Sequence, residues 1–182
     1  ERFTPDGILL KSGNSLPADI IVTATGLKLM FLGGLEVWVD GAKIDFPQAL
    51  TYKGMMYGGV PNLASAFGYT NASWTLKCDL TCEYVCRLLN HMDRTHTDYC
   101  VPQRNDPAVT EEPFLDFSSG YVQRALHLMP KQGSKAPWKL YQNYARDLVA
   151  LRFGRLDDGT MSFAKAAKRT EAGAAQPALE PA

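Results

Sequence analysis

The fold class is decided by the stretch DIIVTATG, residues Asp19–Gly26, in which a continuous apolar run ends abruptly at a glycine. Ile20–Val22 does not alternate between apolar and polar residues, as a strand with one solvated face would. A continuous apolar run is typical of a strand covered on both faces, as in a parallel or mixed sheet flanked by helices. Ile8–Leu10 precedes it as another short strand, and Ser12–Ser15 between them has turn chemistry. The stretch therefore predicts an α/β fold with a mixed sheet.

The longest predicted helix covers residues 73–92, and either Asn71 or Ser73 can cap its first turn. Apolar residues recur at helical spacing along it, namely Leu76, Leu80, Tyr84, Leu88 and Met92. A predicted strand over Asn62–Phe67 and a short loop with Gly68 precede this helix. A helix N-terminus carries about half a positive charge and free N–H groups, which suits an anion or an electron-rich ring carbonyl.

Other elements are predicted from local patterns. Asp40-Gly41 is a favoured two-residue type I′ turn, and it predicts a hairpin between Glu36–Val39 and Lys43–Phe46. Trp138, Tyr141, Ala145 and Leu148 lie roughly on one helical face, which we expect to face the core. The remaining predictions are helices over Tyr121–Met129 and Pro137–Phe153, an exposed connection over Asn105–Pro113 and a disordered tail over 165–182.

Composition excludes several classes of protein. Nineteen Lys and Arg residues balance 19 Asp and Glu residues, so the zero net charge provides no field that would attract nucleic acid or an anionic membrane. The most hydrophobic region, Ile20–Val39, is interrupted by Lys28, Glu36 and several glycines, so we expect no transmembrane segment. The sequence begins at Glu1 rather than methionine and opens directly on strand-like sequence, so we expect a piece of a longer protein, for which the lack of a secretory signal says little. We expect that protein to be cytoplasmic.

The spacing of the cysteines argues against a metal site. Cys78, Cys82 and Cys86 repeat every four residues, and residues eight apart on a helix are about 12 Å apart along its axis. Thiolates that share one zinc ion must each lie about 2.3 Å from it. We therefore expect a buried row of small apolar side chains in a reducing compartment. The sequence also contains no nucleophile elbow, no dinucleotide-binding glycine motif and no P-loop.

Several stretches together resemble flavin-containing and Baeyer–Villiger monooxygenases. DIIVTATG resembles the A-T-G motif that links the NADPH domain back to the FAD domain in that family. Downstream stretches resemble the ethionamide-activating branch in the same order, and the similarity extends over Gly7–Lys165. These stretches are YKGMM at Tyr52–Met56, VPNLA at Val60–Ala64, GYTNASWTL at Gly68–Leu76, PKQGS at Pro130–Ser134, PW at Pro137–Trp138 and QNY at Gln142–Tyr144.

The resemblance implies the C-terminal part of a flavoprotein with two Rossmann-type nucleotide-binding domains. Residues 1–26 would end the NADPH-binding domain and its linker, 27–104 would be the C-terminal part of the FAD-binding domain, and 105–164 would be a C-terminal helical extension. The family's glycine motifs for FAD and NADPH and its arginine near the peroxyflavin do not occur in this sequence. We therefore expect this polypeptide alone neither to turn over nor to hold FAD tightly, and its partners would include the missing N-terminal FAD and NADPH domains.

The implied cofactors are FAD and NADPH. NADPH would reduce FAD, O2 would be captured as a flavin peroxide, and one oxygen atom would be inserted into a ketone or transferred to an organosulfur substrate. The flavin would perform the difficult step, while the protein positions it and excludes water, so no catalytic residue is expected in this segment. An alternative stays open, in which the chain is a non-catalytic interaction or structural module derived from such a flavoprotein.

The resemblance also assigns two groups of binding residues. The helix N-terminus after Gly68 would face the pyrimidine end of the flavin ring and stabilise the anionic reduced form. For Trp74, a flavin contact and a core aromatic are both open interpretations. The expected cofactor-binding residues are Gly26, Gly68, Tyr69, Thr70, Asn71, Ser73 and Trp74. The expected substrate-binding residues are Tyr52, Lys53 and Met55, and no residue is expected to bind a metal.

Overall fold

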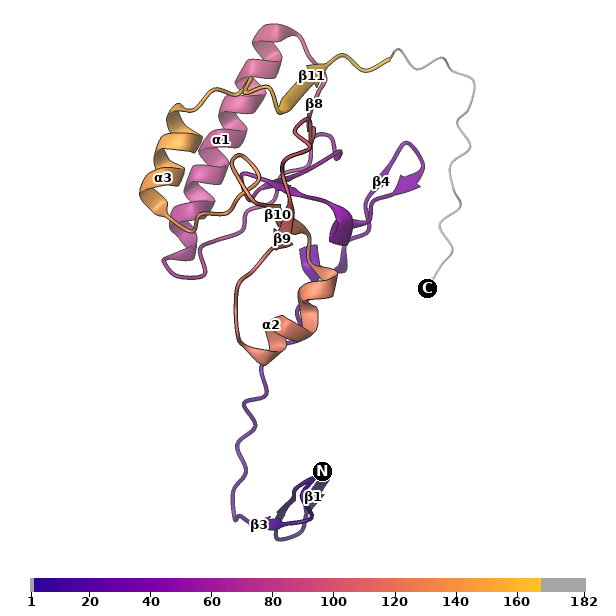
Figure 1. The fold of residues 1–182 in the computed structure, drawn as a ribbon, viewed down its shortest axis with the longest axis vertical. Helices are drawn as coiled ribbons and strands as arrows, with labels where there is room; N and C mark the ends of the chain where they lie inside the picture. The colour runs from indigo at the N-terminus through magenta and orange to yellow at the C-terminus, as the bar shows by residue number, and fades with distance from the viewer. Residues whose placement is uncertain (1, 168–182) are drawn as a thin grey trace.

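Small antiparallel sheets and a few helices make up the fold, in a computed structural model that describes residues 2–167 (Figure 1). β1 (Arg2–Thr4), β2 (Gly7–Leu9) and β3 (Ser15–Pro17) form a three-stranded sheet. The remaining strands pair in twos: β4 (Trp38–Val39) with β5 (Ala42–Lys43), β6 (Thr51–Tyr52) with β7 (Met56–Tyr57), β8 (Tyr99–Pro102) with β11 (Met161–Ala164), and β9 (Glu111–Pro113) with β10 (Lys131–Gly133). Among the described residues, one isolated parallel bridge joins Leu50 to Lys131. The α/β class is therefore present, but small antiparallel sheets replace the expected mixed sheet.

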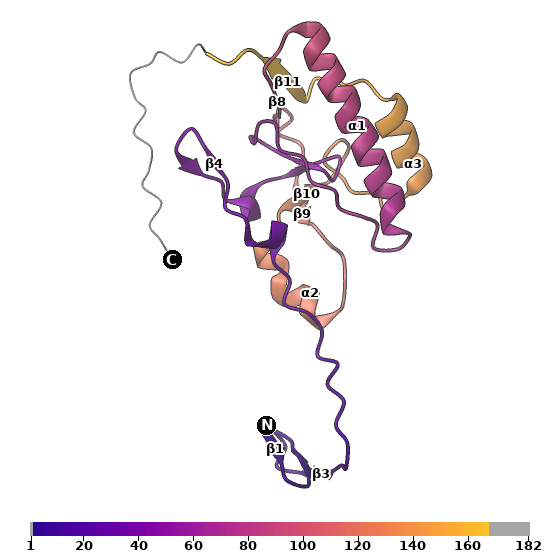
Figure 2. The same ribbon diagram turned by 180° about the vertical axis from the view of Figure 1, so that it is seen from behind.

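The predicted long helix is confirmed as α1 (Trp74–Thr95). It ends at His96, which adopts the left-handed conformation with φ 53° and donates its N–H to the Asp93 carbonyl. α1 lies beside α3 (Tyr144–Leu148), and both views show the two helices along one side of the sheets (Figures 1 and 2). The other helical turns are η1 (Phe31–Gly34), η2 (Phe46–Gln48), α2 (Gly120–Ala125), η3 (Leu126–Leu128) and the π-helical turn η4 (Val149–Phe153).

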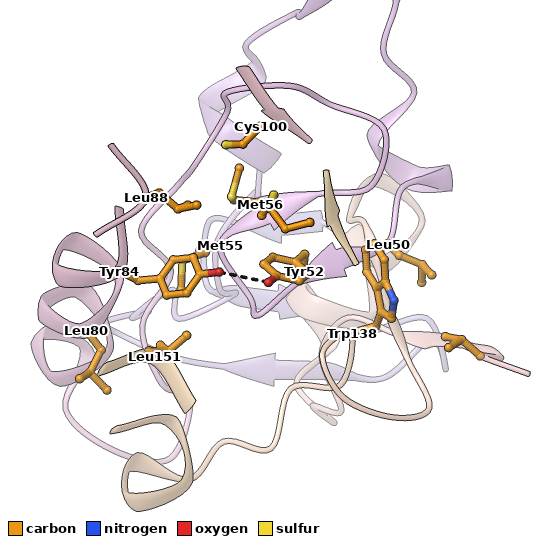
Figure 3. Close-up of a cluster of buried hydrophobic side chains, with 12 residues drawn as sticks. Leu50, Tyr52, Met55, Met56, Leu80, Tyr84, Leu88, Cys100, Trp138 and Leu151 are labelled. Carbon is orange, nitrogen blue, oxygen red and sulfur yellow. Dashed lines mark hydrogen bonds between the residues drawn. The ribbon is translucent and has the colours of Figure 1, made fainter. Parts of the chain in front are cut away.

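The main core lies where α1 covers the β6–β7 hairpin. The buried row of α1 consists of Lys77, Leu80, Thr81, Tyr84 and Leu88. Figure 3 shows Tyr84 pointing from α1 toward Tyr52, and the same cluster contains Leu80, Leu88, Met55, Met56, Trp138 and Leu151. Two smaller clusters adjoin it, one around Phe114 and Val122 and one around Phe46 and Tyr57. Burial of this apolar surface provides most of the free energy that holds α1 in place.

The strand predicted at Ile20–Val22 is wrong. β2 pairs with β3 (Ser15–Pro17), because a tight turn in which the Gly13 N–H donates to the Leu10 carbonyl starts the returning strand early. Ile20 and Val22 are 84% and 85% exposed, and no strand within residues 2–167 pairs with them. In Figure 1 this segment is an extended arm between the β1–β3 sheet and α2.

The strand predicted at Asn62–Phe67 is also wrong, apart from one bridge between Met56 and Ala64. Asn62 has a left-handed backbone with φ 55°, which is incompatible with a strand. Its side chain instead accepts from the Cys100 N–H at 2.9 Å and donates to the Asp98 carbonyl at 3.1 Å. These contacts fasten the loop to β8.

The helix predicted over Pro137–Phe153 begins only at Tyr144. Gln142 is left-handed with φ 50°, which interrupts helical geometry, and Asn143 then caps α3 by accepting from the Arg146 N–H at 3.0 Å. Trp138 is confirmed as a core residue, because it is 2% exposed, whereas Tyr141 and Ala145 are exposed.

The other local predictions have mixed outcomes. The type I′ hairpin is confirmed as β4–β5, with φ 50° at Asp40 and 81° at Gly41, and the helix over Tyr121–Met129 is confirmed as α2 and η3. The connection predicted as exposed contains strand β9 and a buried Val109. The predicted tail lies almost wholly outside the described residues.

The buried row predicted for the cysteines is wrong. Cys82 and Cys86 are exposed and Cys78 is half-buried, whereas Cys100 outside the helix is buried. Each helical residue turns the chain by about 100°, so the row one position earlier, which contains Lys77 and Thr81, faces the core instead. No group of three or more potential metal ligands occurs within residues 2–167.

Replacing Leu80 with Ala is expected to lower the free energy of unfolding by about 2–5 kcal/mol, because the substitution leaves a cavity in the main core. Cys82→Ala, two positions along the same helix but exposed, is expected to change it by less than about 0.5 kcal/mol. Urea denaturation of the two variants measures both values. Equal effects would contradict the assigned rotation of α1.

Thiol labelling at pH 8 is expected to modify Cys82 and Cys86 rapidly and Cys100 slowly. Burial raises the pKa of the Cys100 thiol, which lowers its thiolate fraction at this pH, and it also blocks the reagent. The rate of release of a chromogenic thiol reagent gives the measurement, and a Cys82→Ser/Cys86→Ser variant is expected to lack the fast phase. A fast phase that persists in this variant and requires Cys100 would refute the assignment.

Candidate functional site

The N-terminus of α1 has no side-chain cap. Ser73 occupies the N-cap position without capping, since its hydroxyl lies 2.9 Å from the Thr75 hydroxyl. Asn71 does not cap the helix either, because its side-chain amide donates to the Gln142 carbonyl at 3.0 Å. No acidic residue lies in the first turn. The positive end of the helix dipole is therefore not neutralised by the helix's own side chains.

An apolar cavity of about 460 Å³ lies beside this N-terminus. Thr70 and Trp74 form part of its wall together with Phe67, whose ring centroid is 4.9 Å from that of Trp74 and 5.0 Å from that of Phe114. Trp74 is 50% exposed, so it is a cavity wall rather than a buried core aromatic. The other residues that line this cavity are Leu27, Leu29, Met30, Phe31, Leu32, Ser65, Ala66, Leu115, Phe117, Tyr121, Val122 and Met129.

Two glycines allow close backbone approach around this cavity. A Cβ at Gly68 would lie 2.2 Å from the Trp74 ring, so only glycine lets the indole rest on the backbone there. Gly26 is left-handed with φ 86°, and a Cβ would lie 2.9 Å from the Cβ of Tyr121. Gly26 therefore ends the extended arm against α2, immediately before Leu27 enters the cavity wall.

A second cavity, of about 110 Å³, lies on the other side of Phe67, which lines both cavities. Tyr69 points toward this smaller cavity and donates its hydroxyl to Asp147 Oδ2 at 2.7 Å. Burial and this hydrogen bond raise the pKa of Tyr69 above its ordinary value. Lys77 Nζ lies 2.8 Å from the same Asp147 oxygen. The Asp147 carboxylate of α3 therefore binds both the loop before α1, through Tyr69, and the first turns of α1, through Lys77.

The three expected substrate residues lie at or near a buried pair of tyrosine hydroxyls, those of Tyr52 and Tyr84, which Figure 3 shows. Tyr52 is fully buried, and its hydroxyl lies 3.0 Å from that of Tyr84 and donates to Asp158 Oδ2 at 2.6 Å. Lys53 Nζ lies 3.0 Å from the same Asp158 oxygen. Burial raises the pKa of Tyr52 above its ordinary value and that of Tyr84 to about 12, so both hydroxyls stay protonated. Met55 is fully buried in the same core.

The expected site residues are divided in the structure between the two cavities, the surface beside α1 and the core. Lys53, Gly68 and Tyr69 line the smaller cavity, whereas Thr70 and Trp74 line the larger one. Gly26 abuts Tyr121 of the larger cavity, and Ser73 and Asn71 lie exposed beside the start of α1. Tyr52 and Met55 belong to the core and line neither cavity.

Sequence reasoning did not find four residues that shape the site. Phe67 separates the two cavities, and Gln142, Asp147 and Asp158 hold the segments that line them. Each of the last three contacts residues about 70 or more positions away along the chain. No local pattern marks such partners, and Phe67 fitted equally well at the end of the predicted strand.

The chain is similar to several proteins that are named as FAD-containing or FAD-binding monooxygenases. The FAD-containing monooxygenase EthA of Mycobacterium tuberculosis is 54% identical over 165 residues, which cover 91% of this chain and 34% of EthA. The putative FAD-containing monooxygenase MymA of the same species is 48% identical over 92% of this chain and 34% of its own length. The probable FAD-binding monooxygenase AlmA of Acinetobacter baylyi is 46% identical over 91% of this chain and 33% of its own length.

The chain is a relative of the C-terminal part of FAD-containing monooxygenases. The resemblance stated from DIIVTATG and the downstream stretches is thereby confirmed. The chain spans about a third of the length of these monooxygenases. No family model and no solved structure matches it. Within residues 2–167, none of the helices has the length and apolar character needed to span a bilayer.

Replacing Asp158 with Asn is expected to lower the free energy of unfolding by about 2 kcal/mol at pH 7, because half-buried Lys53 loses its charged partner. Burial alone would raise the pKa of Asp158, but hydrogen bonds from Tyr52 and Lys53 outweigh it and hold the pKa below its ordinary value. The carboxylate therefore stabilises the fold fully above the ordinary carboxyl pKa of about 4, and this contribution is lost as the pH falls through the lower folded-state pKa.

Urea denaturation between pH 7 and pH 3 provides the measurement. The difference between the native chain and Asp158→Asn is expected to shrink below about pH 4. The neighbouring Asp157 is exposed, and Asp157→Asn is the matched control, with an expected change below about 0.5 kcal/mol. A pH-independent difference for Asp158→Asn would contradict the role assigned to its charge.

Proposed function

We propose that this chain forms the C-terminal part of an FAD- and NADPH-dependent monooxygenase that delivers one oxygen atom from O2 to a ketone or a sulfur centre. The observation that carries the proposal is the 54% identity to EthA over 91% of the chain. By this relationship, residues 1–26 would end the NADPH-binding domain, 27–104 would complete a Rossmann-type FAD-binding domain, 105–164 would be the helical extension, and 165–182 would be a tail.

The volume and lining of the larger cavity support the proposal that it receives the flavin ring. Its volume of about 460 Å³ lies within the range of about 300–1,000 Å³ that is usual for ligand pockets, and its wall is apolar and aromatic. Thr70 and Trp74 would contact the ring, Gly68 would allow the backbone to approach it, and Asn71 and Ser73 would lie at its polar edge. Reduced FAD, when bound, would activate O2. The uncapped N-terminus of α1 would stabilise negative charge on the edge of the ring.

We propose that the substrate side lies toward Lys53. Lys53 is the member of the substrate group that lines a cavity, and Tyr52 and Met55 support it from the core. Its ammonium group is held in one position by Asp158, and burial lowers the pKa of Lys53 below its ordinary value. Ketone and thioether substrates cannot be distinguished by this charge alone, and the shape of the completed pocket would select between them.

A non-catalytic interaction module is the alternative function. The observation that favours it is the exposed apolar arm, in which Ile20 and Val22 are 84% and 85% exposed. Such a segment could bind a protein partner. In the enzyme, the same arm would instead be covered by the N-terminal FAD and NADPH domains.

Expression of the natural polypeptide that carries this chain, beside the 182-residue chain alone, tests the proposal. The natural polypeptide is expected to purify with FAD, to oxidise NADPH with O2 and to oxygenate members of a panel of ketones and thioethers. The 182-residue chain is expected to retain no flavin, as measured by absorbance near ~450 nm after gel filtration. A natural polypeptide without flavin or NADPH oxidation would favour the interaction module. Stoichiometric FAD on the short chain would refute the expectation that other domains are needed.

A further inference from the structure

The loop before α1 is held from outside by residues 142–147. The Thr70 N–H donates to Gln142 Oε1 at 3.0 Å, and the Asn71 side-chain amide donates to the Gln142 backbone carbonyl at 3.0 Å. Tyr69 donates its hydroxyl to Asp147 at 2.7 Å. Three successive loop residues are therefore bound to one short segment that is more than 70 positions away in sequence.

Gln142 makes both of its contacts from a strained backbone. Its φ of 50° lies in the left-handed region, which glycine and asparagine adopt far more readily than glutamine. A conformation of this kind persists only where the surroundings hold it, and it occurs most often at functional sites. The left-handed turn directs the carbonyl toward Asn71 while the side chain reaches Thr70. One residue thereby fixes a backbone group and a side chain of the loop at once.

Gln142 does not touch the larger cavity. It lines the smaller one, on the far side of Phe67, whereas Thr70 lines the larger one. A change at Gln142 would therefore reach a ligand in the larger cavity only through the loop. Asn143, the next residue, caps α3 and has no hydrogen bond to the loop among the described residues, so it separates an effect on the loop from an effect on α3.

We propose that Gln142 is a positioning residue for the flavin: it holds Thr70 and Asn71 in the orientation that receives the edge of the ring at the start of α1. This inference rests on the proposed function. Asp147 secures the same loop from the side through Tyr69 and anchors α1 through Lys77. The side-chain oxygen of Gln142 fixes the loop by accepting from the Thr70 N–H, and the left-handed backbone brings this oxygen within hydrogen-bond distance of Thr70.

The test uses the natural polypeptide that carries this chain, with the FAD dissociation constant measured by titration of the apoprotein. Gln142→Met keeps the length of the side chain but removes the acceptor for the Thr70 N–H, and it is expected to raise the dissociation constant about tenfold, as loss of one hydrogen bond at a ligand-facing group would. Gln142→Glu keeps an acceptor oxygen and is expected to restore binding to within about twofold. The flavin midpoint potential is expected to shift in Gln142→Met and to return toward the native value in Gln142→Glu.

Asn143→Ala is the matched control. It is expected to lower the melting temperature by weakening α3 and, because α3 carries Asp147, to raise the FAD dissociation constant by much less than Gln142→Met does. If Gln142→Met does not fold, Gln142→Gly replaces it, since glycine relieves the left-handed strain and also lacks the acceptor.

The outcomes separate the two proposals. FAD binding by the native polypeptide with an unchanged dissociation constant in Gln142→Met, or with equal weakening in Asn143→Ala, would overturn the positioning role alone. A native polypeptide that binds no FAD would overturn the proposed function and this inference together.

Discussion

The contact between the Tyr84 and Tyr52 hydroxyls, 3.0 Å apart, fixes the position of α1. Both side chains are fully buried, and a buried hydroxyl without a partner is costly, so each must find one within the core. Tyr52 also donates to Asp158, which lies in the turn before β11. Three segments that are distant in sequence are thereby coupled. This contact and the apolar packing of Leu80 and Leu88 together set the rotation of α1 about its axis.

That rotation explains why polar residues of α1 are buried while its cysteines are exposed. Lys77 and Thr81 lie in the buried row with Tyr84, and Lys77 is accommodated there because Asp147 neutralises it at 2.8 Å. A buried ammonium group without such a partner would be too costly. The pattern of polar residues along the helix therefore cannot predict which row is buried, because the carboxylate that neutralises Lys77 lies on α3. Leu76, by contrast, belongs to the apolar pattern and is 36% exposed.

The elements predicted correctly from sequence are those that depend on their own residues. α1 is long and has apolar residues at helical spacing, and Asp40-Gly41 forms its turn without contacts from distant residues. The incorrect strands at Ile20–Val22 and Asn62–Phe67 needed partner strands, which no local pattern can supply. The helix expected from Pro137 failed for a similar reason, since Gln142 has a left-handed backbone and contacts the loop before α1, which is distant in sequence. The sequence predicted where the N-terminus of α1 lies, but not that Gln142 and Asp147 hold the loop before it.

The charges of this region are distributed unequally between the two cavities. Three lysines line the smaller one, and Lys53, Lys77 and Lys139 pair with Asp158, Asp147 and Glu112, respectively. No charged residue lines the larger cavity within residues 2–167.

The larger cavity therefore receives its local positive potential from the start of α1, across an apolar wall where weak screening makes a fixed dipole more effective. A fully charged ligand would lose too much hydration in such a place. A flat ring with a polarised edge, as proposed above, would lose little and would contact the aromatic surface of Phe67 and Trp74. The ion pairs around the smaller cavity thus hold the loop and the helix in place without bringing a charge into the larger cavity.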